Sequence, residues 1–151
     1  MRKFAAVLAV ASLALGVPAV HAAMDHGAMK MDHGDVAHEE VVDGVKATFK
    51  VMSMAEHMKE MKMEMPKGMK ETHHIAVEFK DAKTGKALTE GDVKVKVQAP
   101  NKVEQTKDLM GMQGHFGGDF DLSKKGKYGV MAKFKLRDAK VRTSKFWYTV
   151  K

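Results

Sequence analysis

The stretch YGVMAKFKL, from Tyr128 to Leu136, places an apolar or aromatic residue at every second position and sets lysines between several of them. This period of two is typical of a β-strand with one buried face, because successive side chains point to opposite sides. The same alternation recurs outward along the chain, in the runs 45–51, 75–80, 93–98, 116–122 and 146–150. The pattern predicts a protein built from strands.

Turn-forming residues separate these runs, at positions 83–85, 90–92, 100–101, 124–126 and 137–138. Roughly seven short strands with frequent turns favour an all-β fold, an antiparallel β-sandwich of the immunoglobulin-like type. We expect this domain to span residues 41–151, since the alternation begins there.

A methionine-rich insertion, residues 52–70, interrupts the strand pattern. Met54, Met58, Met61 and Met65 follow the spacing of one helical face, and Pro66 and Gly68 would end the helix. We predict a short helix over residues 55–65. An extended strand through Met61, Met63 and Met65 is the alternative.

The N-terminus has the layout of a secretory signal peptide. Arg2 and Lys3 precede an apolar run from Phe4 to Val17, and small residues follow up to Ala22. The run is shorter than the roughly 20 residues that span a membrane. We therefore expect residues 1–22 to be cleaved, the protein to be exported to the periplasm, and no membrane span to remain.

Residues 23–40 contain few large hydrophobic side chains other than methionine, and they repeat the motif Met-Asp-His-Gly at 24–27 and 31–34. Such a segment buries too little apolar surface to offset the entropy of ordering it. We predict a disordered tail rich in histidine and methionine.

The chain has no cysteine but 14 methionines and 8 histidines. Without thiolates it cannot hold a c-type haem, an iron–sulfur cluster, a thiolate zinc site or a blue-copper centre. Thioether sulfur and imidazole together suit copper, with Cu(I) favoured over Cu(II). The net charge of +7 is spread as single lysines, which does not indicate a nucleic-acid-binding surface.

Three groups of residues are candidate copper ligands, and in each group packing or solvation is the alternative role. The tail offers His26, Met31 and His33. The methionine-rich insertion offers His57, Met58, Met61 and Met65. The third group is His73, His74, Met110, Met112 and His115, at the ends of predicted strands. No catalytic motif accompanies them, so we do not expect an enzyme.

Three motifs resemble the YtkA-like family of small exported immunoglobulin-like domains. They are His73-His74-Ile75-Ala76-Val77, the lysine-and-valine strand ending in Gln98-Ala99-Pro100, and Gly126-Lys127-Tyr128-Gly129-Val130. The resemblance implies a β-sandwich associated with copper or with the bacterial envelope. In composition, the tail is similar to those of periplasmic copper-resistance proteins.

These observations predict an exported copper-binding protein, in effect a metallochaperone. It would capture or buffer copper through Met and His ligands, or deliver it to an envelope protein. The alternative is a non-metal interaction module that docks on an envelope complex, with the methionines forming an adaptable apolar surface.

Overall fold

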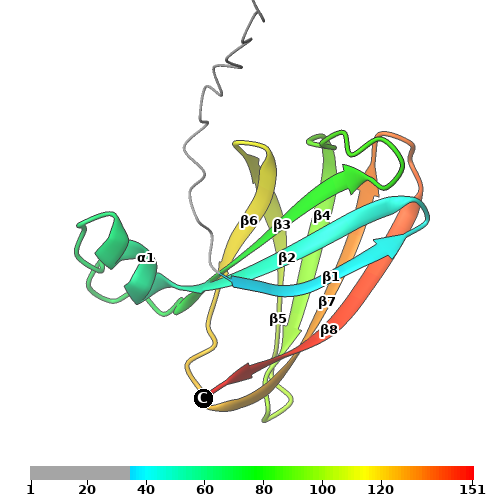
Figure 1. Ribbon diagram of the computed structural model, residues 1–151. Coiled ribbons are helices and arrows are strands. Elements are labelled where there is room, and N and C mark those ends of the chain that lie inside the picture. The colour runs from blue at the N-terminus through cyan, green and yellow to red at the C-terminus, as the bar shows by residue number, and fades with distance from the viewer. Residues whose placement is uncertain (1–34) are drawn as a thin grey trace, which may run out of the picture. The chain divides into compact units, whose positions relative to one another are not determined.

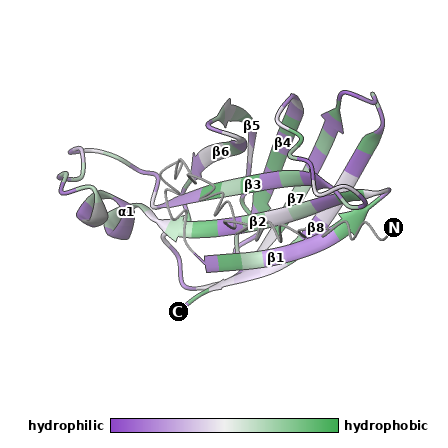
Figure 2. Cartoon of the chain, turned by 45° about the horizontal axis from the view of Figure 1, so that its top comes forward, coloured by the Kyte–Doolittle hydropathy of each residue, from purple (hydrophilic) through white to green (hydrophobic). Residues whose placement is uncertain are grey.

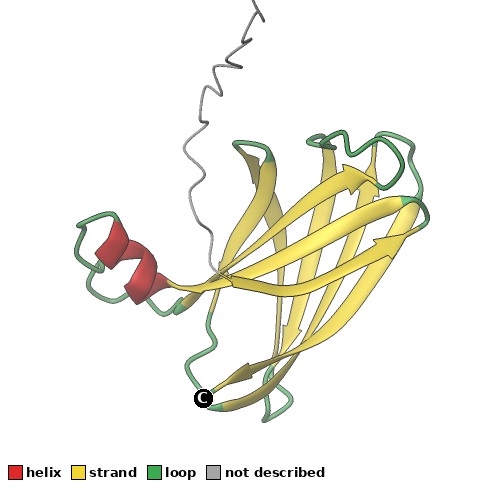
Figure 3. Ribbon diagram, viewed as in Figure 1, coloured by secondary structure: helices red, strands yellow, loops and turns green. Residues whose placement is uncertain are grey.

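The computed structural model describes residues 35–151, and the predicted signal peptide and most of the predicted tail lie outside this range. The described chain is an antiparallel β-sandwich with one short helix (Figure 1, Figure 3). The elements are β1 (Asp35–Val42), β2 (Val45–Ser53), α1 (Met54–Glu60), β3 (His73–Asp81), β4 (Gly91–Gln98), β5 (Glu104–Met112), β6 (His115–Phe120), β7 (Gly126–Leu136) and β8 (Val141–Val150). The all-β prediction is confirmed.

The strands form two sheets that share β5, in the order β1-β2-β3-β6-β5-β4-β7-β8. Sheet A contains β1, β2, β3, β6 and the end of β5. Sheet B contains the start of β5, β4, β7 and β8. β1 and β8, the two strands at the ends of this order, also contact each other, because the rings of His38 on β1 and Phe146 on β8 stack with centroids 5.0 Å apart.

Apolar and polar residues alternate along most of the strands (Figure 2), and the buried apolar residues form one core between the two sheets. Phe79 on β3 is fully buried in it, with its ring 4.4 Å from that of Phe134 and 5.7 Å from that of Phe116. The hydroxyl of Tyr128 donates to the carbonyl of Lys124 at 2.8 Å, which resembles the tyrosine corner of immunoglobulin-like sandwiches.

β1 begins at Asp35, so residues 35–40 of the predicted tail belong to the sheet. The two strands β1 and β2 are joined by Asp43 and Gly44, both with positive φ (44° and 76°), as in a type I′ hairpin turn. This tight turn places β1 beside β2, where Ala37 and Val42 pack partly on the core. The strand pairing with β2 and the partial burial of Ala37 and Val42 order the segment despite its polar composition.

The buried residue Arg142 connects the turn between β7 and β8 to the turn between β1 and β2. Its guanidinium donates to the two carboxylate oxygens of Asp138, at 3.0 and 2.6 Å, and to the carbonyl of Asp43 at 3.1 Å. The side chain of Arg142 is only 3% exposed. These hydrogen bonds lower the pKa of Asp138 from 3.8 to about 2.

We expect Asp138→Asn to lower the melting temperature at pH 7, because the ionised carboxylate stabilises the fold. A lowered pKa means that this stabilisation is complete above the unfolded-state value of about 4 and is lost as the pH falls through about 2. Melting temperatures of both proteins across this range should therefore converge at low pH. A gap that stays constant with pH would contradict the assignment.

Candidate metal centre

The outer face of sheet A collects most of the third group of candidate ligands. On β6, the core residues Phe116 and Phe120 alternate with His115, Gly117 and Asp119, which face outward. His74 on β3 pairs with Asp119, and Met110 and Met112 on β5 pair with Gly117 and His115. Paired residues share a face, so these side chains lie together on the outside of the sheet.

The turn between β5 and β6 sets Met112 directly opposite His115. Gln113 and Gly114 have φ values of 43° and 86°, as a two-residue type I′ turn requires. Because the register Met112↔His115 is fixed by this turn, a thioether and an imidazole are cross-strand neighbours. The sequence predicted a strand junction here but not its register.

Gly117 forms the floor of the site. A Cβ atom built on Gly117 would lie 2.6 Å from Nε2 and 2.8 Å from Cε1 of His74, and 3.6 Å from the methyl carbon of Met112. The imidazole of His74 therefore rests on bare backbone, with the methyl end of Met112 next to it. Any side chain at position 117 would occupy space that both groups border.

Asp119 orients the ring of His74. Their Nδ1 and Oδ1 atoms are 2.7 Å apart, and this hydrogen bond is the main cause that lowers the pKa of Asp119. An ionised carboxylate can only accept, so Nδ1 carries a proton, and in the metal-binding tautomer of this ring the lone pair is on Nε2. A carboxylate behind a histidine is the usual support of a metal-binding imidazole.

His115 adds a buried imidazole to the same face, with 5% of its surface exposed. Burial is the largest cause that lowers its pKa, and the neighbouring His74 lowers it further. His115 is consequently neutral near pH 7, and the neutral imidazole is the form that binds metals.

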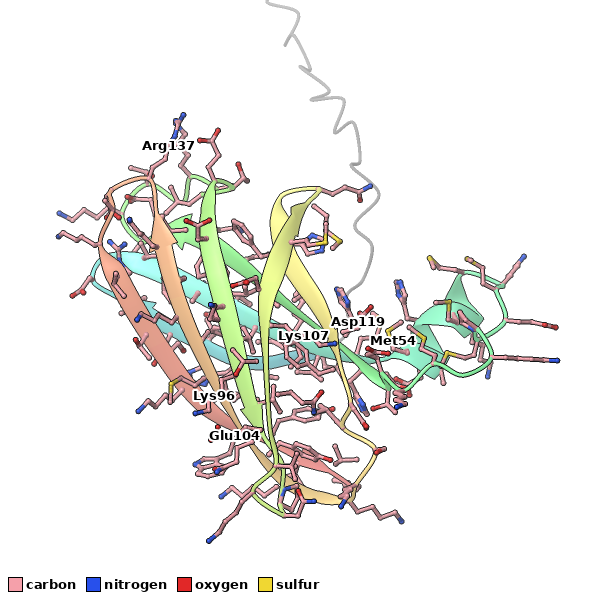
Figure 4. All side chains as sticks on the ribbon, turned by 180° about the vertical axis from the view of Figure 1, so that it is seen from behind. Met54, Lys96, Glu104, Lys107, Asp119 and Arg137 are labelled. Carbon is pink, nitrogen blue, oxygen red and sulfur yellow. The ribbon has the colours of Figure 1, made fainter. Side chains whose placement is uncertain are left out.

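The helix α1 brings a third imidazole to this face. The rings of His57 and His74 are nearly parallel, at 10°, with centroids 6.4 Å apart. Met54 anchors the start of the helix, since it is buried and its N–H donates to the carbonyl of Thr72 at 2.8 Å. Figure 4 shows Met54 and Asp119 near each other, where α1 leaves the sandwich. The second and third groups of candidate ligands therefore meet at His57 and His74.

The helix is shorter than the predicted range of 55–65. It ends at Glu60 because Lys62 adopts a left-handed conformation (φ 55°), and the N–H groups of Lys62 and Met63 donate to the carbonyls of Lys59 and Met58. This is a Schellman motif. Met58 stays half-buried on the helix, whereas Met61 caps it and Met65 lies in the loop, so the predicted stripe of four methionines is broken.

His73 does not join His74, because neighbours on a strand point to opposite faces. Its Nδ1 lies 2.8 Å from the hydroxyl oxygen of Thr72, and its ring meets Tyr148 edge-on at 6.2 Å. Burial lowers the pKa of His73. Met110 shares the outer face of the site but is 72% exposed. His26, Met31 and His33 lie outside the described residues.

The candidate ligands predicted from the sequence include neither Gly117 nor Asp119. The signal that could have found them is the alternation around His115, because residues 115, 117 and 119 share one face of a strand. Their partners on β3 could not be read from spacing.

This face presents imidazole nitrogen from His57, His74 and His115 and thioether sulfur from Met112, donor types that suit a soft ion such as Cu(I). Within residues 35–151, no three His, Asp or Glu side chains form a group that could hold a metal by themselves. In the same part of the chain, no helix has the length and apolar character needed to cross a membrane.

No family model and no curated protein matches the chain. Among solved structures, a copper-bound variant of FetP from uropathogenic Escherichia coli is 10% identical with a TM-score of 0.60, over 77% of this chain and 95% of that chain. A DUF4426 family protein from Pseudomonas aeruginosa PAO1 is 12% identical with a TM-score of 0.57, over 75% of this chain and 96% of that chain. These likenesses support the sandwich fold, and the YtkA-like resemblance stays a prediction.

Proposed function

We propose that this protein is exported to the periplasm, where it binds Cu(I) at the outer face of sheet A and buffers it or delivers it to an envelope protein. The ligands are His74 and Met112, joined by either His57 or His115. The protein has no catalytic activity of its own in this proposal. The copper-bound state of the FetP variant supports the choice of metal for a sandwich of this fold.

The observation that carries the proposal is that His74 and Met112 both border the space above Gly117, which a side chain at that position would fill. A thioether needs no deprotonation and prefers soft monovalent ions. Because Asp119 forms a hydrogen bond with Nδ1 of His74, the proposed ligand atom of this ring is Nε2. In this proposal the copper ion is only bound and released, by exchange of its ligands. The chain's part is to hold Nε2 of His74 and the sulfur of Met112 on one face without an intervening side chain.

Gly117→Ala is expected to weaken Cu(I) binding at least about tenfold, because the new methyl group would take the place of the His74 ring and separate it from Asp119. Anaerobic competition with a chromophoric Cu(I) chelator measures the affinity.

Gly111→Ala is the matched control on the neighbouring strand. Its Cβ would lie 3.6 Å from the ring of Phe116, an ordinary contact, and its φ is not in the left-handed region. Equal affinities for the two variants and the unmodified protein would reject the site above Gly117.

A second candidate function is docking on a protein partner, as an interaction module. The observation that favours it lies on sheet B, where Trp147 is 63% exposed, packs on Gly129 and has the ammonium group of Lys127 4.8 Å from its ring centroid. Exposed tryptophans are frequent anchors of interfaces. A partner captured equally by the copper-free protein and by a variant that binds no copper would favour this function.

A further inference from the structure

The segment from α1 to Met65, which we call the methionine arm, exposes thioethers that take no part in the core. Met61 is 38% exposed, Met63 is 56% exposed and Met65 is 38% exposed. Figure 1 shows α1 and the loop that follows it projecting from one end of the sandwich. Packing therefore explains Met54 at the base of the arm but not the three methionines beyond the helix.

His57 connects the nearest of these methionines, Met61, with His74 of the candidate site. Its carbonyl accepts the N–H of Met61 at 3.1 Å, and residues four apart on a helix share one face. On its other side, its ring lies 6.4 Å from that of His74. Metal–nitrogen bonds are about 2 Å long, so an ion that leaves His57 needs to move only a short distance to reach His74.

The charge of the arm presents no barrier to a monovalent cation. Residues 54–65 contain three acidic side chains (56, 60 and 64) and two basic ones (59 and 62). The arm is close to neutral, so attraction of a soft cation comes mainly from the thioethers. Their long, flexible side chains can rearrange around a soft ion at little cost.

We infer that the methionine arm is a second, weaker binding site for soft monovalent cations, and that it passes them through His57 to His74 and Met112. This inference rests on the proposed function, because it gives the inner site its route of entry. The transfer is an exchange of neutral ligands around Cu(I), so no electron or proton needs to move. Tethering a weak site beside a tighter one raises the local ion concentration at the tighter site.

The test is the rate at which the mature protein takes Cu(I) from its bicinchoninate complex, followed by the loss of that complex's absorbance without oxygen. Replacing Met61, Met63 and Met65 together by leucine keeps the apolar volume and removes the sulfur. We expect uptake to slow about tenfold, with the equilibrium affinity unchanged. Residues before 35 are the same in all proteins compared, so any contribution of these residues to the uptake rate cancels in the comparison.

Met131→Leu is the control, since Met131 is 36% exposed on β7, in the other sheet. It should leave both the rate and the affinity unchanged. A triple variant with the uptake rate of the unmodified protein, while His74→Ala loses affinity, would overturn the entry role and leave the inner site standing. If the unmodified protein itself takes up no Cu(I), the proposed function fails as well.

Discussion

Replacing His74 with alanine is expected to weaken Cu(I) binding by about a hundredfold, or about 2.8 kcal/mol. The variant removes the imidazole that rests on Gly117, and with it the ligand that Asp119 orients. Loss of a supporting partner alone typically costs 10- to 100-fold in metal affinity, so loss of the ligand itself belongs at the upper end of this range. The measurement is an anaerobic chelator competition at neutral pH.

His73→Ala is the matched control, because the two histidines are adjacent in sequence and lie on opposite faces of β3. His73 contacts Thr72 and Tyr148, away from the site, and its loss should leave the affinity unchanged. Met112→Leu supplies an independent test of the same site, since it preserves side-chain volume. If His73→Ala reduced the affinity as much as His74→Ala, the site would not lie on the outer face of sheet A.

Strand periodicity predicted most of the fold, because a half-buried strand leaves a direct trace in the sequence. The alternate positions 128, 130, 132, 134 and 136 of the run from Tyr128 to Leu136 are all buried in β7. The sequence pattern did not predict β1, because the composition of this strand is polar and its inward residues are small or only partly buried. The dipeptide Asp43-Gly44 was the available signal, as a strong marker of a type I′ hairpin.

The candidate site could be predicted only in part, since its members come from four separate elements. Residue chemistry indicated His57, His74, Met112 and His115, but spacing could not show that α1 returns beside β3. The pairing of β3 with β6 decides which histidine of the pair 73–74 faces Asp119. A slip of one residue in that register would have presented His73 instead.

Phe79→Ala is expected to cost about 3–5 kcal/mol of unfolding free energy, the largest stability effect of any change considered for this chain. Phe79 is 1% exposed and contacts Phe116 and Phe134, so truncation leaves a cavity between the two sheets. Domains of this size are stable by roughly 5–15 kcal/mol, and the variant should still fold at 25 °C if the unmodified domain lies well inside this range. Chemical denaturation measures the difference in unfolding free energy. Val141→Ala is the control, since position 141 on β8 is 56% exposed, and it should change the unfolding free energy by less than about 0.5 kcal/mol.

The same variant separates the core from the candidate metal site, because Phe79 points into the sandwich whereas His74 and Met112 lie on the outside of sheet A. A ligand that binds only the folded state stabilises it by an amount set by its concentration and its affinity. At equal free Cu(I), we therefore expect copper to raise the unfolding free energy of Phe79→Ala by as much as it raises that of the unmodified protein. A smaller increment would show that the cavity disturbs the register of β3 and β6, and that the inner core helps to position the ligands on the outer face.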